Sequence, residues 1–565
     1  MFNKKKTNFI SEIKTENIDL NNLDKEINNL DNYIIYKIKN KFKIFDRNCD
    51  HAGGKILSMN GVHKCPYHNW RFNPKKGEYF NGIKKKELDY KIINNKLIIN
   101  RKSNTPKINL ENSSEVVKIK YFNHAFLTIK NNFFKFATDP WALGPAFGTG
   151  WWLSNSTTKN WIKEINECDF IYISHNHPDH MHALTLSLVR KNMLFLIPSF
   201  STKSVFKCLK DLGFTNIFCA DFLKEYSFKN SDLNLMILKS GDFRDDSGIY
   251  FSAGGTSFLL SVDSNNLNSL NLPKVDIYAS SYAAGASGYP LIFENYKLNE
   301  KKWILNQNKN LLKSLRLKEI KISKAKYFLP YAGNFDELLL RDKYINKNNI
   351  KNKINDFKII EKTGSKLLNI KKYNEFNFLS GKLILKKFNK EKKFQDLSPK
   401  SYYLKYKKNF SQIDHKYIKR YFTNSNFKDN LKLYVSLTND DFTKAVKNFY
   451  VDFSYKKIVF RNLKRKIQKK ELQSEYIINE KKILFIKARI DSFFDLIVNK
   501  NPWEDLSIGF QCRVFRIPNE YNANFWYHFS NIYIKSGKIR QSNKCKNCEV
   551  LNQNLQKELV LNGAI

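Results

Sequence analysis

Short apolar runs separated by glycine and asparagine dominate the first hundred residues of the chain. Residues 33–36, 41–45 and 97–99 are rich in β-branched and aromatic side chains. Such runs, bounded by turn-forming residues, are typical of β-strands. The pattern therefore predicts a small all-β domain over residues 1–105, and we expect the polar stretch at 101–106 to end it.

From about residue 115 the pattern changes to an alternation of strand-like and helix-like segments. Apolar runs predict strands at 116–121, 126–129, 170–174, 194–197 and 258–263. Helical stretches are expected at 181–190 and 202–212. This alternation predicts an α/β sandwich domain over residues 115–340.

The last third of the chain is mixed and rich in aromatic residues. Residues 341–400, with a polar break at 346–356, are expected to form a linker and to complete the sandwich domain. Residues 401–565 are expected to form a mixed α/β region with Lys-rich helical pieces such as 461–472. The predicted fold class is therefore multidomain α+β.

Composition and charge exclude several classes of protein. The chain has 565 residues, 42% of them hydrophobic, which is enough for about three domains with buried cores. No apolar run reaches the roughly 20 residues of a membrane span, and the first residues lack the apolar stretch of a secretory signal. The net charge of +44 comes from lysines spread along the whole length. We therefore expect a solvated basic surface and no nucleic-acid partner.

The eight cysteines are distributed unevenly. Cys545 and Cys548 form a lone CxxC pair, which is expected to be exposed and not a zinc or redox site. Four further cysteines in apolar surroundings are expected to be buried thiols: Cys168, Cys208, Cys219 and Cys512. Such cysteine usage predicts a reducing, cytoplasmic compartment.

A first cluster of metal-binding residues lies in the β-rich N-terminal part. Cys49 and His51 form a Cys-x-His pair, and thirteen residues later Cys65 and His68 form a Cys-x-x-His pair. Two such pairs on two β loops can hold a [2Fe–2S] cluster, with the cysteines on one iron and the histidines on the other. A zinc site with the same ligand types is the alternative, but no finger-like helix is present. His63 is expected to lie outside the ligand set.

A second cluster follows the strand expected at 169–174 and precedes a helix. It consists of His175, His177, Asp179 and His180, with His182 expected to lie outside the ligand set. The loop at the carboxyl end of a strand is where α/β folds place their sites. Histidines and a carboxylate at this spacing indicate a pocket for one or two metal ions.

The remaining ligands of this pocket are less clear from the sequence. Asp263 ends a later strand and is a candidate bridging or closing carboxylate. His415 and His528 lie far from the positions expected for further histidine ligands, and three carboxylates are substitutes: Asp242, Asp245 and Asp246. Two histidines and one carboxylate with open positions typically hold non-haem Fe(II) for oxygen chemistry, and zinc is the alternative.

The first cluster resembles the Rieske signature, and the second resembles the metallo-β-lactamase signature, whose domains have αββα layers. Their combination resembles the CMP-N-acetylneuraminate hydroxylase family, which converts the N-acetyl group of CMP-sialic acid to N-glycolyl. Further segments are similar to that family: 139–147, 150–152, 284–288, 331–333, 508–511 and 525–526. The likeness extends over essentially the whole chain.

This resemblance implies an iron-dependent monooxygenase that takes a nucleotide sugar, CMP-sialic acid, as substrate. It implies a [2Fe–2S] cluster on Cys49, His51, Cys65 and His68, reduced by a cytochrome b5 or ferredoxin-type donor with its reductase. It also implies that non-haem iron binds at the second cluster, with the catalytic set His175, His177, Asp179, His180 and Asp263.

Three other functions stay open from the sequence. A metal-dependent hydrolase would hold zinc in the second site and turn over without oxygen. A nucleic-acid-binding protein would depend on the +44 charge and lose affinity steeply with salt. The same oxygenase chemistry on another acylated or nucleotide-linked sugar is the third.

Overall fold

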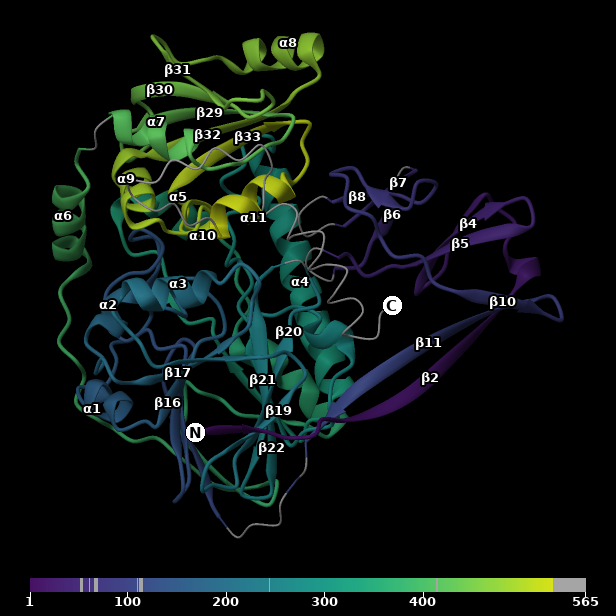
Figure 1. Cartoon of the computed structure of the whole chain (residues 1–565), viewed down its shortest axis with the longest axis vertical. Helices are drawn as coiled ribbons and strands as arrows, with labels where there is room; N and C mark the ends of the chain where they lie inside the picture. Colours follow the sequence, from purple (N-terminus) through teal and green to yellow (C-terminus); the bar gives the residue numbers. More distant parts are fainter. Residues whose placement is uncertain are drawn as a thin grey trace.

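The computed structural model describes residues 1–50, 54–59, 61–65, 70–108, 110, 115–242, 244–412 and 415–531. Two eight-stranded sheets form its centre (Figure 1). The first sheet has the order β1 (Phe2–Lys4), β19 (Glu225–Phe228), β20 (Asn234–Lys239), β21 (Ser247–Ala253), β22 (Thr256–Val262), β23 (Ile277–Ser281), β24 (Tyr327–Tyr331) and β26 (Lys366–Leu367). The second has the order β18 (Ile217–Ala220), β17 (Leu194–Pro198), β16 (Phe170–Tyr172), β14 (Lys135–Thr138), β13 (Phe126–Lys130), β12 (Val117–Asn123), β27 (Glu375–Leu379) and β28 (Lys382–Lys387).

Alternating side chains of the second sheet enter two different cores. Phe170 and Tyr172 face the first sheet and join the large core between the two sheets. Ile171, one position along, faces outward and packs in a separate core. That outer core is covered by three helices: α1 (Trp161–Asn166), α2 (Ala183–Ser187) and α3 (Ser204–Asp211). The period-two alternation of a strand buried on both faces therefore places helices outside this sheet.

The long helix α4 (Leu298–Ile322) covers the first sheet. Ile304, Leu305 and Ile320 join the core of that sheet, and Glu319 accepts a hydrogen bond from Tyr278 on β23. Helices thus lie on both outer faces of two stacked sheets, and the predicted αββα arrangement is confirmed.

The N-terminal part leaves the sandwich on a long ribbon. After β1, strand β2 (Asn8–Asp19) pairs along its length with β11 (Lys96–Lys107), and β10 (Tyr90–Ile93) pairs with β11. The polar stretch at 101–106, which we expected to end the β domain, therefore forms the last part of strand β11. Pairing with β2 satisfies its backbone groups, which the polarity of the side chains does not reveal.

Two small sheets lie at the far end of this ribbon (Figure 1). One contains β3 (Ile27–Asn29), β4 (Tyr33–Ile38) and β5 (Lys41–Asp46). The other contains β6 (Leu57–Met59), β7 (Val62–Lys64), β8 (Arg71–Asn73) and β9 (Glu78–Tyr79), and a 3₁₀ turn, η1 (Leu20–Asn22), follows β2. This part is all-β, as predicted.

The C-terminal region adds a five-stranded sheet. Its order is β31 (Val459–Leu463), β30 (Ala445–Asp452), β29 (Leu431–Thr438), β32 (Lys482–Arg489) and β33 (Cys512–Ile517). Its helices are α6 (Pro399–Asn409), α7 (His415–Thr423), α8 (Lys469–Asn479), α9 (Ile490–Asn499), α10 (Glu504–Ile508) and α11 (Ala523–Asn531). The helix expected at 461–472 is wrong at its start, because residues 459–463 pair with β30.

The remaining elements are short. They are β15 (Trp152–Leu153) paired with β25 (Phe335–Asp336), the helix α5 (Lys343–Asn348), and the 3₁₀ helices η2 (Leu267–Leu270), η3 (Leu340–Asp342) and η4 (Ile354–Thr363). The polar break expected at 346–356 thus covers the end of α5 and the start of η4. Among the described residues, none of the helices combines the length and the apolar character that crossing a membrane requires.

Two buried ion pairs hold the C-terminal sheet against the sandwich. Arg489 contacts Asp342 at 2.5 Å, and Arg341 contacts Asp491 at 2.8 Å. Close to them, the backbones of Gly150 and Gly509 touch, so that a Cβ on Gly150 would lie 2.1 Å from the Gly509 carbonyl oxygen. Only glycine allows this approach.

We predict that Gly150→Ala lowers the free energy of unfolding by about 1–3 kcal/mol, because the added methyl group forces the two backbones apart. Thermal and denaturant unfolding measure this. Gly213→Asn is the control for added bulk, because position 213 lies in open space; its φ of +86° adds some backbone strain, which asparagine limits, so it should lose less stability than Gly150→Ala. Equal stability of Gly150→Ala and the wild type would contradict the close packing.

Candidate metal centre

The loop after β16 carries the second predicted cluster. His175 to His180 lie at the carboxyl end of this strand and precede α2, as expected for a site at a sheet edge. The side chains of His175, His177, Asp179 and His180 are all buried. Asp263, directly after β22 in the other sheet, points to the same place, and its carboxylate lies 3.3 Å from His180 Nε2.

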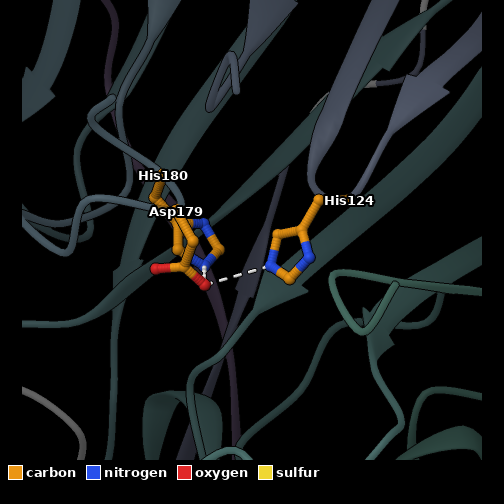
Figure 2. Close-up of side chains that lie close together, drawn as sticks. All are labelled: His124, Asp179 and His180. Atoms are coloured by element: carbon orange, nitrogen blue, oxygen red, sulfur yellow. Dashed lines mark ion pairs between the residues drawn. The ribbon is translucent and has the colours of Figure 1, made fainter. Parts of the chain in front are cut away.

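A further histidine, which the sequence analysis did not consider, completes the cluster. His124 lies in the turn between β12 and β13, and its Nε2 is 3.0 Å from Asp179 Oδ2 (Figure 2). His180 Nε2 lies 3.3 Å from the same oxygen. The position of His124 just after a predicted strand could have suggested that it belongs to the metal-binding cluster, because strand ends meet at one edge of a sheet.

Potential ligand atoms form two overlapping groups that share His180. One group is His124, Asp179 and His180, and the other is His175, His180 and Asp263. Within each group the ligand atoms all lie within 4.8 Å of one another. His177 lies beside the second group, with its Nδ1 2.9 Å from His175 Nε2. The two groups give room for one or two metal ions.

A buried carboxylate orients two of these imidazoles. Asp139 accepts hydrogen bonds from the backbone N–H and the hydroxyl of Ser174, at 2.8 and 2.7 Å. Its Oδ2 also lies 3.1 Å from His180 Nδ1, which leaves His180 Nε2 directed at the cluster. The Ser174 hydroxyl contacts His175 Nδ1 at 2.9 Å. Such outer partners fix the ring orientation of metal-binding histidines.

Glu504 of α10 orients His177 from the C-terminal region. Its Oε2 lies 3.3 Å from His177 Nε2, so Nδ1 is the nitrogen that faces His175. Burial lowers the pKa of His177, but the hydrogen bond and charge of Glu504 outweigh it and raise this pKa to about 9. Burial and the nearby His180 and His177 hold the pKa of His175 well below its usual range.

The donor atoms of the cluster fit a metal ion. Buried nitrogen and oxygen atoms without a hydrogen-bond partner include His124 Nδ1, Asp179 Oδ1 and Asp263 Oδ1. Burial alone would raise the pKa of Asp179, but the charge of His180 and the hydrogen bonds from His124 and His180 hold it well below its usual range. Neutral imidazole and ionised carboxylate are the forms that bind iron or zinc.

The three substitute carboxylates have other partners. Asp242 accepts from the Arg244 guanidinium at 2.8 Å, and Asp246 lies 3.1 Å from the same guanidinium. Asp245 accepts a hydrogen bond of 2.5 Å from Thr202. None of the three falls in either ligand group of the described residues. The carboxylates near residue 242 therefore bind Arg244 and Thr202 in place of a metal.

The other histidines of the described chain have structural contacts. His182 caps α2 and contacts the Thr185 hydroxyl at 2.9 Å and the Pro145 carbonyl at 3.0 Å. His528 contacts the Ser425 carbonyl, and His415 contacts Asn462. Cys168 and Cys512 are buried and Cys208 is half-buried, but Cys219 lies exposed on the edge strand β18, so its predicted burial is wrong.

The first predicted cluster is described only in part. Cys49 and Cys65 are buried and share one core. The Cys49 N–H donates to the Gly54 carbonyl and the Cys65 N–H to the Trp70 carbonyl, each at 2.8 Å. Their partners in the predicted cluster, His51 and His68, lie outside the described residues, as do Cys545 and Cys548. His63, on β7, contacts Asn29 at 2.7 Å.

A chain of contacts joins the two predicted metal sites. The ring of Trp70, next to the cysteine loop, lies 6.0 Å from the ring of Tyr521. The Tyr521 hydroxyl donates to Glu504 Oε1 at 3.4 Å, and Glu504 Oε2 contacts His177. Arg71 and Glu520 form an ion pair beside this path. The C-terminal region therefore contacts both the N-terminal domain and the sandwich.

One cavity of about 230 Å³ opens onto the cluster. His124, His177, Asp179 and Asp263 form its metal-binding end. Its other walls come from the sandwich and from the C-terminal region, and include Phe147, Trp151, Tyr289, Phe293, Arg316, Phe335, Glu504, Arg516, Tyr521 and Trp526. Aromatic rings and small aliphatic side chains together form much of the lining, so the cavity combines an apolar wall with a few charged groups, as substrate pockets do.

Comparison with known proteins defines the class. Residues 11–91 match the family described as Rieske [2Fe-2S] domain. The chain therefore combines an N-terminal Rieske domain with an αββα sandwich that carries a second metal-binding cluster. Among solved structures it is similar to the isothiocyanate hydrolase from Delia radicum gut bacteria, with 16% identity and a TM-score of 0.32 over 44% of this chain and 95% of that chain.

More specific similarity comes from curated sequences. The cytidine monophosphate-N-acetylneuraminic acid hydroxylases of Macaca mulatta and Xenopus laevis are each 28% identical, over 88% of this chain and 88% of theirs. That of Pongo pygmaeus is 29% identical over 88% of this chain and 89% of its own. The chain is thus a relative of these hydroxylases over nearly its whole length, as the sequence motifs predict.

We predict that His124→Ala and His180→Ala each reduce the metal bound per chain at the second centre, because each removes a ligand atom. Metal analysis with an acid-labile sulfide assay separates this metal from the cluster iron, and loss of metal should leave sulfide unchanged. His182→Ala is the matched control from the same loop. It should keep the metal and lose about 0.5–2 kcal/mol of stability with its helix cap. Full metal content in His124→Ala would contradict the assignment of His124.

We predict that, in chelator-treated protein, His177 stays protonated up to pH about 9 because Glu504 accepts its Nε2–H. Since this pKa lies above the ordinary 6.5, the interaction contributes fully to stability below pH 6.5 and is lost as pH rises through about 9. In Glu504→Gln, burial should leave the imidazole neutral and remove this pH dependence. NMR titration of the histidines measures the protonation of His177, and melting curves measure the pH dependence of stability. Identical pH profiles for the wild type and Glu504→Gln would contradict the role of Glu504.

Proposed function

We propose that this protein is an iron-dependent monooxygenase that hydroxylates the N-acetyl methyl group of CMP-N-acetylneuraminate to give CMP-N-glycolylneuraminate. The observation that carries the proposal is the contact chain from the Rieske domain to the second metal-binding cluster, through Tyr521 and Glu504. A hydrolase does not need an electron carrier beside its metal. The similarity to the curated hydroxylases over 88% of the chain supports the same activity.

The two metal groups would supply the redox chemistry. Cys49, His51, Cys65 and His68 would hold a [2Fe–2S] cluster, which would supply single electrons, and the second centre would hold non-haem iron, which would supply the chemistry with dioxygen. The protein provides positioning and excludes water. Histidines and carboxylates from both sheets converge there, and the catalytic set is His175, His177, Asp179, His180 and Asp263, joined by His124.

Glu504 has two roles in this proposal. Its Oε2 holds the proton of His177 Nε2, which keeps Nδ1 free as a ligand atom. Its Oε1 accepts from the Tyr521 hydroxyl, which lies against the Rieske domain. Glu504 would therefore hold His177 and Tyr521 in fixed positions between the two sites. Apolar residues of the cavity wall, such as Trp151 and Phe335, whose rings stack at 3.6 Å, would limit the access of water.

The electron donor is expected to be a small protein of the cytochrome b5 or ferredoxin type, with its reductase. A donor with an acidic surface would suit a chain with a net charge of +44. The cysteine usage supports a reducing, cytoplasmic compartment for the reaction. The substrate is a nucleotide sugar and also anionic, so the same charge favours its approach.

The experiment that tests this function is turnover of CMP-N-acetylneuraminate by iron-loaded protein with dioxygen, a reductase and its small donor. The expected product carries one additional oxygen atom in its acyl group, seen by mass spectrometry, and the oxygen should derive from labelled dioxygen. His175→Ala should lower the rate by at least about 10²-fold, because the iron loses a ligand, with an unchanged Rieske EPR spectrum.

Two controls separate this function from the alternatives. His415→Ala changes a histidine far from the cavity and should retain full turnover. Turnover without oxygen and reductant, with zinc bound, would instead indicate a hydrolase. Hydroxylation of other acylated or nucleotide-linked sugars at higher kcat/KM would keep the chemistry and change the substrate.

A further inference from the structure

Three arginines line the cavity beside the metal-binding cluster: Arg244, Arg316 and Arg516. Arg244 forms ion pairs with Asp242 and Asp246. Arg316 forms an ion pair with Glu319 at 2.7 Å. These two guanidinium groups are therefore neutralised within the fold.

Arg516 differs from the other two. It lies on β33, is 1% exposed, and forms no ion pair with a carboxylate of the described chain. Its Nε donates to Asn519 Oδ1 at 3.0 Å, and its guanidinium lies 4.6 Å from the centre of the Phe293 ring. Tyr296 is its other hydrogen-bonding neighbour. Nη2 is buried and has no hydrogen-bond partner.

A buried guanidinium without a counter-charge is costly to a fold. Burial disfavours its charged form, and here burial lowers the pKa of Arg516, with only tyrosines acting against it. Uncompensated buried charge of this kind costs several kcal/mol. Hydrogen bonds to ionised groups are worth more than neutral ones, and arginine matches the geometry of carboxylate and phosphate oxygens. The cavity side of Arg516 thus has the properties of an anion-binding site.

We propose that Arg516 binds the anionic group of the substrate in this cavity, an oxyanion of the phosphodiester or carboxylate type. The proposal rests on the proposed function, since it concerns the substrate of the same cavity. It also gives the substrate a direction. At the metal-binding end, the carboxylates of Asp179 and Asp263 would bind the metal, whereas Arg516 is a cavity arginine without a carboxylate partner in the described chain. The anionic group therefore lies at Arg516, and the acyl group faces the metal.

Apolar stacking supports the role of Arg516 as a preformed site. Phe293 and Tyr289 pack around the guanidinium, with ring centres 4.6 and 6.0 Å from its carbon atom. The Asn519 hydrogen bond fixes Nε, so the guanidinium plane is held without a ligand. A rigid fork loses little entropy when it binds an oxyanion.

The test compares ligand binding by the wild-type holoprotein, Arg516→Gln and Arg516→Lys, measured by isothermal titration calorimetry. The probes are CMP-N-acetylneuraminate, CMP and N-acetylneuraminate. CMP carries a phosphate without a carboxylate, and N-acetylneuraminate carries a carboxylate without a phosphate. We expect Arg516→Gln to weaken CMP-N-acetylneuraminate binding by about 10- to 150-fold, the range for a hydrogen bond to a charged group. The lysine variant should recover part of this loss.

The two smaller probes identify which oxyanion binds. Loss of affinity for CMP alone places the phosphate at Arg516, and loss for N-acetylneuraminate alone places the carboxylate there. Arg513→Gln is the matched control on the same strand. Its guanidinium donates to the Cys512 carbonyl at 2.9 Å, and it does not line the cavity. Its affinities should equal those of the wild type.

Melting curves separate a ligand site from a packing role. Because Arg516 lacks a counter-charge, Arg516→Gln should keep or raise the melting temperature of the ligand-free protein. A lower melting temperature with unchanged affinity for all three probes would overturn the proposal.

Failure of the proposed function gives a different result. If the wild-type protein binds none of the three probes, CMP-N-acetylneuraminate is not its substrate. Inorganic phosphate and acetate then probe the site directly in thermal-shift assays. If either anion raises the melting temperature of the wild type but not that of Arg516→Gln, the anion site at Arg516 is supported. Equal shifts in melting temperature for the two proteins would overturn it.

Discussion

The buried cluster of imidazoles and carboxylates around His180 is the constraint on which the rest of the structure depends. Charged groups taken out of water must be paired, hydrogen-bonded or bound to metal. Asp139, Ser174 and Glu504 satisfy one side of the cluster. On the other side, His124 Nδ1, Asp179 Oδ1 and Asp263 Oδ1 have no hydrogen-bond partner in the described chain. The fold therefore brings ligand atoms together and leaves the last interactions to a metal ion.

The C-terminal region is part of this site and not an appendage. Its helix α10 supplies Glu504, and the segment before α11 supplies Tyr521, which contacts the Rieske domain. The backbone contact between Gly150 and Gly509, together with the Trp151 indole N–H bonded to the Ile508 carbonyl, sets the distance between this region and the sandwich. Two buried ion pairs hold the same interface, so the cavity exists only when the parts are docked.

Charge is distributed unequally over this cavity. Carboxylates gather at the metal-binding end, where cations bind, and Arg516 lies in the wall that the C-terminal sheet provides. The overall charge of +44 affects the approach of ligands and not their orientation, because it acts over long distances and is screened by salt. Under the proposed function, long-range attraction would bring the anionic substrate to the molecule. Short-range pairing at a buried guanidinium determines how that substrate is oriented.

Local patterns determined most of the elements and both ligand motifs. Strands near 33–46 and 170–174 follow from their apolar runs, and the spacing of His175, His177, Asp179 and His180 within one loop needs no tertiary information. Tertiary information is needed for the extension of β11 through 101–106 and for the strand at 459–463. In both segments, pairing with a strand distant in sequence outweighs local polarity. The same holds for His124, Glu504 and Arg516. Each acts through neighbours more than fifty residues away in the chain, and only the packing of two sheets and a third region brings them to one cavity.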